Sequence, residues 1–142
     1  MEDILKKLIE YPTISESSNI NLMSYIDDYL RKFDIKGKLI QGEKNQFNYH
    51  CMIGPNKDGG IIFSGHTDVV PVEGQDWMSN PFKLLKKNNK YYGRGTCDMK
   101  GFIAVCLSLV PQIKIKKLKK PIHFIFSYDE EIGCVGIKKP IP

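Results

Sequence analysis

The sequence lacks any apolar run of the roughly 20 residues that a membrane-spanning helix needs. Acidic Glu2 and Asp3 stand near the N-terminus, where a secretory signal would carry positive charge. Its few cysteines form no CxxC pair, and nothing else indicates an oxidising compartment, so we expect reduced thiols. These absences favour a cytoplasmic protein without a membrane partner. The cysteines are Cys51, Cys97, Cys106 and Cys134.

Arginine is almost absent although the formal net charge is +5, because Arg31 and Arg94 are the only arginines. Bidentate recognition of phosphate or guanine favours arginine over lysine. The densest basic run spans residues 114–120 and includes Ile115 and Leu118. We interpret it as a solvated connection, with a nucleic-acid patch as the alternative. The composition therefore predicts no nucleic-acid partner.

The chain shows no repeat, low-complexity block or linker, and its 142 residues fit one domain with a real core. The patterns predict helices over residues 2–11, from about 20 to 33 after the capping candidates Ser17, Ser18 and Asn19, and over 99–109. They predict strands at 38–41, 47–53, 60–64 (of the buried type) and 122–127, and a hairpin of 82–87 with 90–92. Helices alternating with strands predict an α/β fold with a mixed, partly parallel sheet flanked by helices.

Three polar clusters follow apolar strands or begin a helix, at residues 66–68, 97–99 and 129–131. In open α/β sheets, ligands bind at the carboxyl ends of the strands, so these clusters can converge. His66 ends a predicted strand, and Asp68 could accept the second N–H of its imidazole, as metal-bound histidines require. A polar histidine beside a turn aspartate is the alternative.

Asp98 lies between glycines at the start of a predicted helix, where it could bind a ligand or only cap the helix. Asp129, Glu130 and Glu131 end an apolar strand and repel one another unless a cation or shared proton offsets their charge. One such carboxylate can bind a metal while its neighbour takes a proton from water. A solvated acidic turn is the alternative.

One imidazole with several carboxylates is a ligand set that suits zinc, cobalt or manganese. The sequence has no nucleophile elbow, and its glycine-rich residues 93–98 lack the Lys-Ser/Thr ending of a phosphate loop. The combination favours metal-assisted hydrolysis.

Three ordered segments resemble a known family: residues 64–71 (SGHTDVVP), 93–101 (GRGTCDMKG) and 128–133 (YDEEIG). They are similar to the signatures of the aminoacylase-like co-catalytic zinc hydrolases, which include acetylornithine deacetylase, succinyl-diaminopimelate desuccinylase and carboxypeptidases. Residues 71–77 and 127–134, with Cys97, look most similar to acetylornithine deacetylase.

The resemblance implies a site that holds two zinc or cobalt ions and hydrolyses the amide of a small N-acyl amino acid, such as N-acetylornithine in arginine biosynthesis. It implies that His66 and Glu131 each bind one metal and that Asp98 bridges both. Glu130 would be the catalytic base, and Asp68 would orient His66. It also implies a cis peptide after Asp98.

The same resemblance implies that residues 1–142 are the N-terminal portion of one catalytic domain, without the dimerisation domain and the C-terminal part of the catalytic domain. We expect Pro140 and Pro142 to interrupt a helix that the family begins there. The remaining histidines, His50 and His123, are poor replacements for the missing ligands, so metal binding should be weak or absent. Two hypotheses stay open: an enzyme completed by a complementary chain, and a catalytically inactive remnant.

Overall fold

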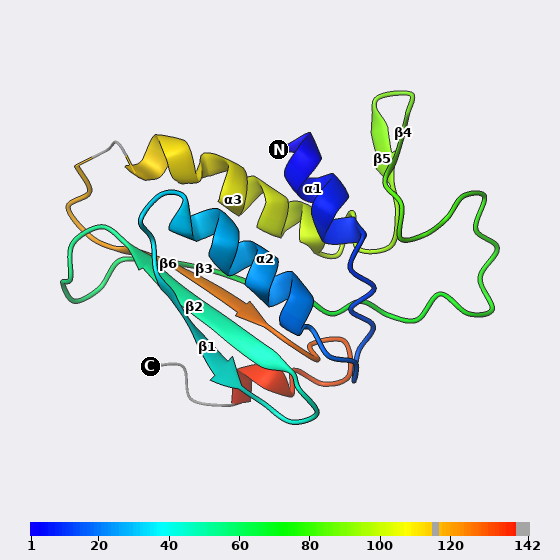
Figure 1. The fold of residues 1–142 in the computed structure, drawn as a ribbon, viewed down its shortest axis with the longest axis horizontal. Coiled ribbons are helices and arrows are strands. Elements are labelled where there is room, and N and C mark those ends of the chain that lie inside the picture. The colour runs from blue at the N-terminus through cyan, green and yellow to red at the C-terminus, as the bar shows by residue number, and fades with distance from the viewer. Residues whose placement is uncertain (115–116, 139–142) are drawn as a thin grey trace.

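The computed structural model describes residues 1–114 and 117–138, which form one layer of helices on a four-stranded sheet, with a small hairpin beside it (Figure 1). No helix in these two ranges is long and apolar enough to cross a bilayer. The helices are α1 (Glu2–Ile9), α2 (Ile20–Arg31), α3 (Lys100–Lys114) and the short 3-10 helix η1 (Gly136–Lys138). The strands are β1 (Gly37–Gln41), β2 (Phe47–Ile53), β3 (Ile61–His66), β4 (Leu85–Lys87), β5 (Lys90–Tyr92) and β6 (Ile122–Ser127).

The main sheet has the strand order β1-β2-β6-β3. β2 pairs antiparallel with β1 and β6, whereas β3 pairs parallel with β6. This confirms the predicted mixed, partly parallel α/β sheet. The parallel register places His66 opposite Ser127, so the carboxyl ends of β3 and β6 lie at the same edge.

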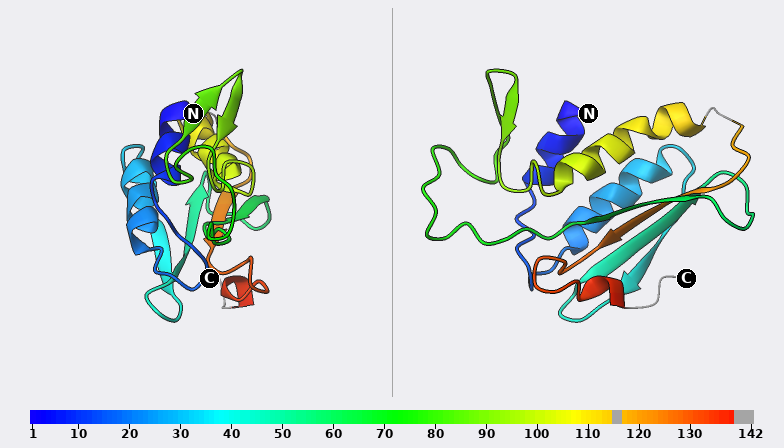
Figure 2. Two further views of the ribbon diagram at one scale, coloured as in Figure 1. Left: turned by 90° about the vertical axis from the view of Figure 1, so that its right-hand side faces the viewer. Right: turned by 180° about the vertical axis from the view of Figure 1, so that it is seen from behind.

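The hydrophobic core lies between the sheet and the three α-helices, which cover one of its faces (Figure 2). Alternate residues of β2 and β6 point into it, as the period of two in a strand requires. Each fully buried aliphatic side chain there contributes about 1.5–3 kcal/mol relative to exposure. The helix and strand side chains that share this core include Leu8, Leu22, Ile26, Tyr49, Cys51, Leu107, Phe124 and Phe126.

Strand β3 differs from its prediction as a buried strand. It spans Ile61–His66, and the side chains of Ile61 and Ile62 are 59% and 60% exposed. The reason is its place in the sheet, since β3 is an edge strand in the part of the chain that the structure describes. Its apolar sequence alone could not distinguish an edge from a centre.

Three other boundaries differ from the predictions. α1 ends at Ile9, and α3 continues through Pro111 to Lys114 because Val110 is still buried in the core. The predicted strand at 82–87 is reduced to Leu85–Lys87. Asn80 explains this, because its side chain accepts the Phe82 N–H and its carbonyl accepts the next N–H, forming a turn.

Asn19 occupies the N-cap position of α2 but makes no side-chain capping bond. Its amide instead pairs with the main chain of Phe47, donating to the carbonyl at 2.9 Å and accepting the N–H at 2.8 Å. The residue that was expected to cap a helix therefore fastens that helix to the start of β2. Pro140, Pro142 and Ile115, on which other predictions depend, lie outside the described residues.

The cysteines divide into two exposed thiols and two buried ones. Cys97 and Cys134 are exposed and free, whereas burial raises the pKa of Cys51 to about 12 and that of Cys106 to about 11.

Because the thiolate is the reactive form, we expect an aromatic disulfide reagent to modify two thiols in the native protein and all four in denaturant. Absorbance of the released thiolate measures this. Four fast thiols in native buffer would contradict the core described above.

Candidate metal centre

The three polar clusters meet at the edge where β3 and β6 end. A pocket of about 240 Å³ opens there, lined by the end of β3, the start of α3 and the segment after β6. Residues about 30 to 70 positions apart in the sequence thus share one surface because the parallel strands end together. The lining residues are Ser64, Gly65, His66, Met99, Ser127, Glu130 and Ile137.

His66 is buried at the centre of this arrangement. Its Nδ1 lies 2.9 Å from the main-chain oxygen of Asp68, while its Nε2 lies 3.0 Å from Asp98 Oδ1 and 3.6 Å from Glu130 Oε2. Burial lowers the pKa of His66, but the carboxylates of Asp68 and Asp98 outweigh it and raise the pKa to about 9. The two carboxylates thus favour the protonated form of the imidazole.

Asp68 was expected to accept the second N–H of His66, and the structure places two of its oxygens near His66 Nδ1. The nearer acceptor is its main-chain oxygen, because the carboxylate Oδ1 is 3.4 Å away. The carboxylate instead accepts the N–H groups of Glu130 (3.0 Å) and Glu131 (3.2 Å) and the hydroxyl of Ser15 (2.8 Å). Burial raises the pKa of Asp68, but His66 and these donors lower it overall. Asp68 thus joins two motif segments.

Asp98 projects from the loop that precedes α3, and its side chain is 72% exposed. The peptide after it is cis, as the resemblance implied. The alternative of helix capping is not needed, since the first amides of α3 bond to main-chain oxygens, Lys100 N to Gly95 O at 2.8 Å. Gly95 has φ +83°, and a Cβ at Gly101 would lie 2.3 Å from the Thr96 oxygen, so this loop requires its glycines.

The sequence suggested that the three acids after β6 form one cluster of like charges. In the structure they do not. Asp129 is buried and turns away, accepting the Glu16 N–H and the Gln46 amide, both at 2.7 Å. Glu130 lines the pocket, and Glu131 lies beside His66 and Asp98. Partial burial and the charge of Asp98 raise the pKa of Glu131.

One group of potential metal ligands results. Ligand atoms of His66, Asp98 and Glu131 all lie within 4.8 Å of one another. An imidazole with two carboxylates fits zinc or cobalt, and the contact of His66 Nδ1 with a carbonyl is the outer hydrogen bond that metal-binding histidines make. Within residues 1–114 and 117–138 it is the one such group. Because a catalytic zinc ion normally has three protein ligands, these donors suffice for one ion and not for two.

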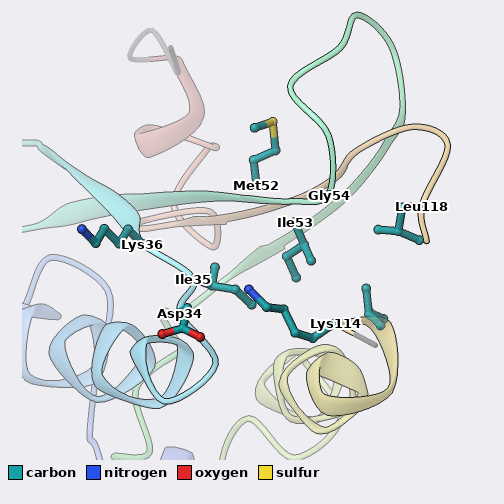
Figure 3. A pocket seen from close by; sticks show the side chains of 9 residues that line it. Asp34, Ile35, Lys36, Met52, Ile53, Gly54, Lys114 and Leu118 are labelled. Carbon is teal, nitrogen blue, oxygen red and sulfur yellow. The ribbon is translucent and has the colours of Figure 1, made fainter. Parts of the chain in front are cut away.

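His50 and His123 lie on strands β2 and β6 and hydrogen-bond to each other at 3.0 Å. They are not among the residues that line the pocket of the metal centre. A larger pocket of about 320 Å³ lies at the opposite ends of the strands, beside Ile53 and Leu118 (Figure 3). It is lined chiefly by apolar side chains and lysines and lacks the imidazole and carboxylates of the metal centre.

Sequence reasoning missed the residues that hold the site in place. Ser15 and Gln46 each bond to an acid of a motif segment. Lys100 is fully buried and donates to the Tyr11 oxygen at 2.6 Å, and burial lowers its pKa to about 7. Lys100 could have been noticed because it begins a mostly apolar helix. No spacing pattern identified Ser15 or Gln46.

The mixed sheet, with an imidazole and carboxylates gathered at the ends of its parallel strands, defines a protein of the metallopeptidase type. The model of peptidase family M20/M25/M40 matches residues 62–142, which is more than half of the chain. The chain belongs to this family.

Curated relatives extend the likeness over nearly the whole chain. An acetylornithine deacetylase of Buchnera aphidicola subsp. Schizaphis graminum is 42% identical over 95% of the chain, and one of Shigella sonnei is 35% identical over 96%. The chain spans 37% of the length of each of these relatives.

Solved structures share the fold. An M20 family metallo-carboxypeptidase from Sulfolobus solfataricus superimposes with a TM-score of 0.83 at 24% identity, covering 94% of this chain and 32% of that one. Human carnosine dipeptidase 1 gives 0.82 at 23% identity, covering 96% and 33%.

Metal binding at His66 should compete with its proton. Because the raised pKa keeps the imidazole protonated below about 9, an ion must displace a proton, and its affinity should rise about tenfold per pH unit as pH increases toward that value. Calorimetric zinc titrations at several pH values measure this. His123→Ala should keep the dependence, and His66→Ala should abolish binding. An affinity that does not change with pH would contradict the assignment of His66.

Proposed function

We propose that this chain supplies the core of a metal-dependent hydrolase that cleaves the amide bond of a small N-acyl amino acid, with N-acetylornithine as the substrate to test first. The observation that carries the proposal is that the ligand atoms of His66, Asp98 and Glu131 lie within 4.8 Å of one another, beside a pocket that His66 and Glu130 line. The relatives that are acetylornithine deacetylases support the choice of substrate.

His66, Asp98 and Glu131 would hold zinc or cobalt. A bound ion supplies Lewis acidity toward the amide carbonyl. The ligand residues themselves keep their relative positions through the hydrogen bonds of Asp68 and of the glycine-containing loop.

Glu130 would be the catalytic base. Its side chain is 43% exposed, lines the pocket and approaches His66 Nε2 to 3.6 Å. It would take one proton from the attacking water and give that proton to the nitrogen of the leaving amine, so that it ends the reaction as it began. The nearby side chains of Met99 and Ile137 offer apolar surface to a small acyl group.

A complementary polypeptide is part of the proposal, because the described donors suffice for one ion. Strand β3 has exposed Ile61 and Ile62, and within residues 1–114 and 117–138 no further strand pairs with its outer edge, so such a chain could add there. The relatives, of which this chain spans 37%, are long enough to contain further ligands.

Hydrolysis is tested by release of ornithine from N-acetylornithine with added zinc or cobalt, for the wild-type chain and for Glu130→Ala. We expect the loss of the base to reduce the rate by about 10²–10⁴-fold. Glu10→Ala is the matched control, because Glu10 is exposed to a similar degree, 41%, and lies in a surface ion pair. Equal rates for Glu130→Ala and wild type would exclude Glu130 as the base.

Metal content after dialysis separates the remaining cases. Near two ions per chain would mean that the chain completes its own site, whereas about one would agree with the donors described above. Folded protein with no bound metal and no activity would support the inactive remnant over the hydrolase.

A further inference from the structure

We infer that residues 11–16, which connect α1 to α2, are a positioning element that sets the three motif segments relative to one another, and that Ser15 is its decisive side chain. The effect of this element on catalysis rests on the function proposed above, whereas its contacts with the motif segments are independent of that function. These residues touch residues 64–71, 93–101 and 128–133, each through a different group.

The first contact is a short parallel bridge to the segment that follows β3. Ile14 pairs with Val69, with the Val69 N–H donating to Thr13 O at 3.0 Å and the Ser15 N–H donating to Val69 O at 3.1 Å. The Thr13 hydroxyl also donates to Thr67 O at 2.5 Å. This bridge fixes the main chain on both sides of Asp68.

The second contact holds the loop that carries Asp98. The Lys100 ammonium is buried and donates to Tyr11 O at 2.6 Å. Burying an ammonium is costly unless it is hydrogen-bonded, so its contact with the Tyr11 oxygen constrains the spacing between the connection and the start of α3.

The third contact reaches the acids after β6. The Glu16 N–H donates to Asp129 Oδ1 at 2.7 Å, and Asp129 immediately precedes Glu130. Glu16 has φ +67°, so the chain turns sharply at this point to present its amide.

Ser15 joins the first contact to the third. Its hydroxyl donates to Asp68 Oδ2 at 2.8 Å, and the two oxygens of that carboxylate accept the Glu130 and Glu131 N–H groups. Without the hydroxyl, Oδ2 keeps only the longer bond from Glu131, at 3.2 Å. Ser15 therefore acts on the base and on a ligand candidate through Asp68, as a positioning residue.

Ser15→Ala tests this in the whole chain by nuclear magnetic resonance of backbone amides. We expect the Glu130 and Glu131 signals to shift and their hydrogen exchange to accelerate about tenfold, with unchanged helix content by circular dichroism. Ser15→Thr, which retains a hydroxyl, should restore both. Ser18→Ala is the matched control, since the Ser18 hydroxyl donates at the same 2.8 Å to Asn45 O at the surface.

A lysine pair tests the second contact independently. Lys100→Met should shift the signals of residues 93–101, whereas Lys120→Met, which removes an equally short 2.6 Å bond to Asp58 O, should not. Unchanged Glu130 and Glu131 signals in Ser15→Ala, or equal effects of Ser15→Ala and Ser18→Ala, would overturn the inference.

The zinc affinity of Ser15→Ala should fall by about tenfold and recover in Ser15→Thr, as for residues that support metal ligands. Amide changes in a folded protein that neither binds zinc nor hydrolyses N-acetylornithine would uphold the positioning element and reject the proposed function. Hydrolysis by the wild-type protein, with unchanged Glu130 and Glu131 signals in Ser15→Ala, would support the proposed function and reject the positioning element.

Discussion

The parallel pairing of β3 with β6 is the constraint on which the rest of the structure depends. It places His66 opposite Ser127, so that the residues after both strands emerge at the same edge of the sheet. The core side chains Phe124 and Phe126 hold β6 against the helices and maintain this pairing. Apolar burial far from the pocket therefore determines where the polar side chains meet.

A second constraint is the burial of Asp68. A carboxylate removed from water must find donors, and here they are Ser15 and the main chain of Glu130 and Glu131. Each donor left without its acceptor would cost about 1–3 kcal/mol, so the polar network selects one arrangement of the motif segments. The exposed ligand candidate Asp98 needs no such network and is held by its loop instead.

The predictions succeeded where local rules apply. The strands at 47–53 and 122–127 have the observed bounds, because alternating or compact apolar runs between turn residues leave few alternatives. His66, Asp98, Glu130 and Glu131 were identified as motif residues, and the structure brings them together. The predictions were wrong about the burial of β3, the start of the strand at 82–87 and one of the three capping candidates, Asn19. An edge position and the bond of Asn19 to Phe47 depend on residues distant in sequence, and the turn around Asn80 depends on competing local bonds.

The sequence by itself determined the types and order of the elements, the candidate site residues and the family to which they point. These follow from periodicity and from ordered motifs, both of which are properties of neighbouring residues. Only the tertiary structure decided that Asp129 turns away from the pocket, that Asp68 uses its carboxylate on main-chain amides, and that residues 11–16 touch all three motif segments. These contacts join residues 50 to 110 positions apart, and such pairs are set by packing and by the need to satisfy buried polar groups.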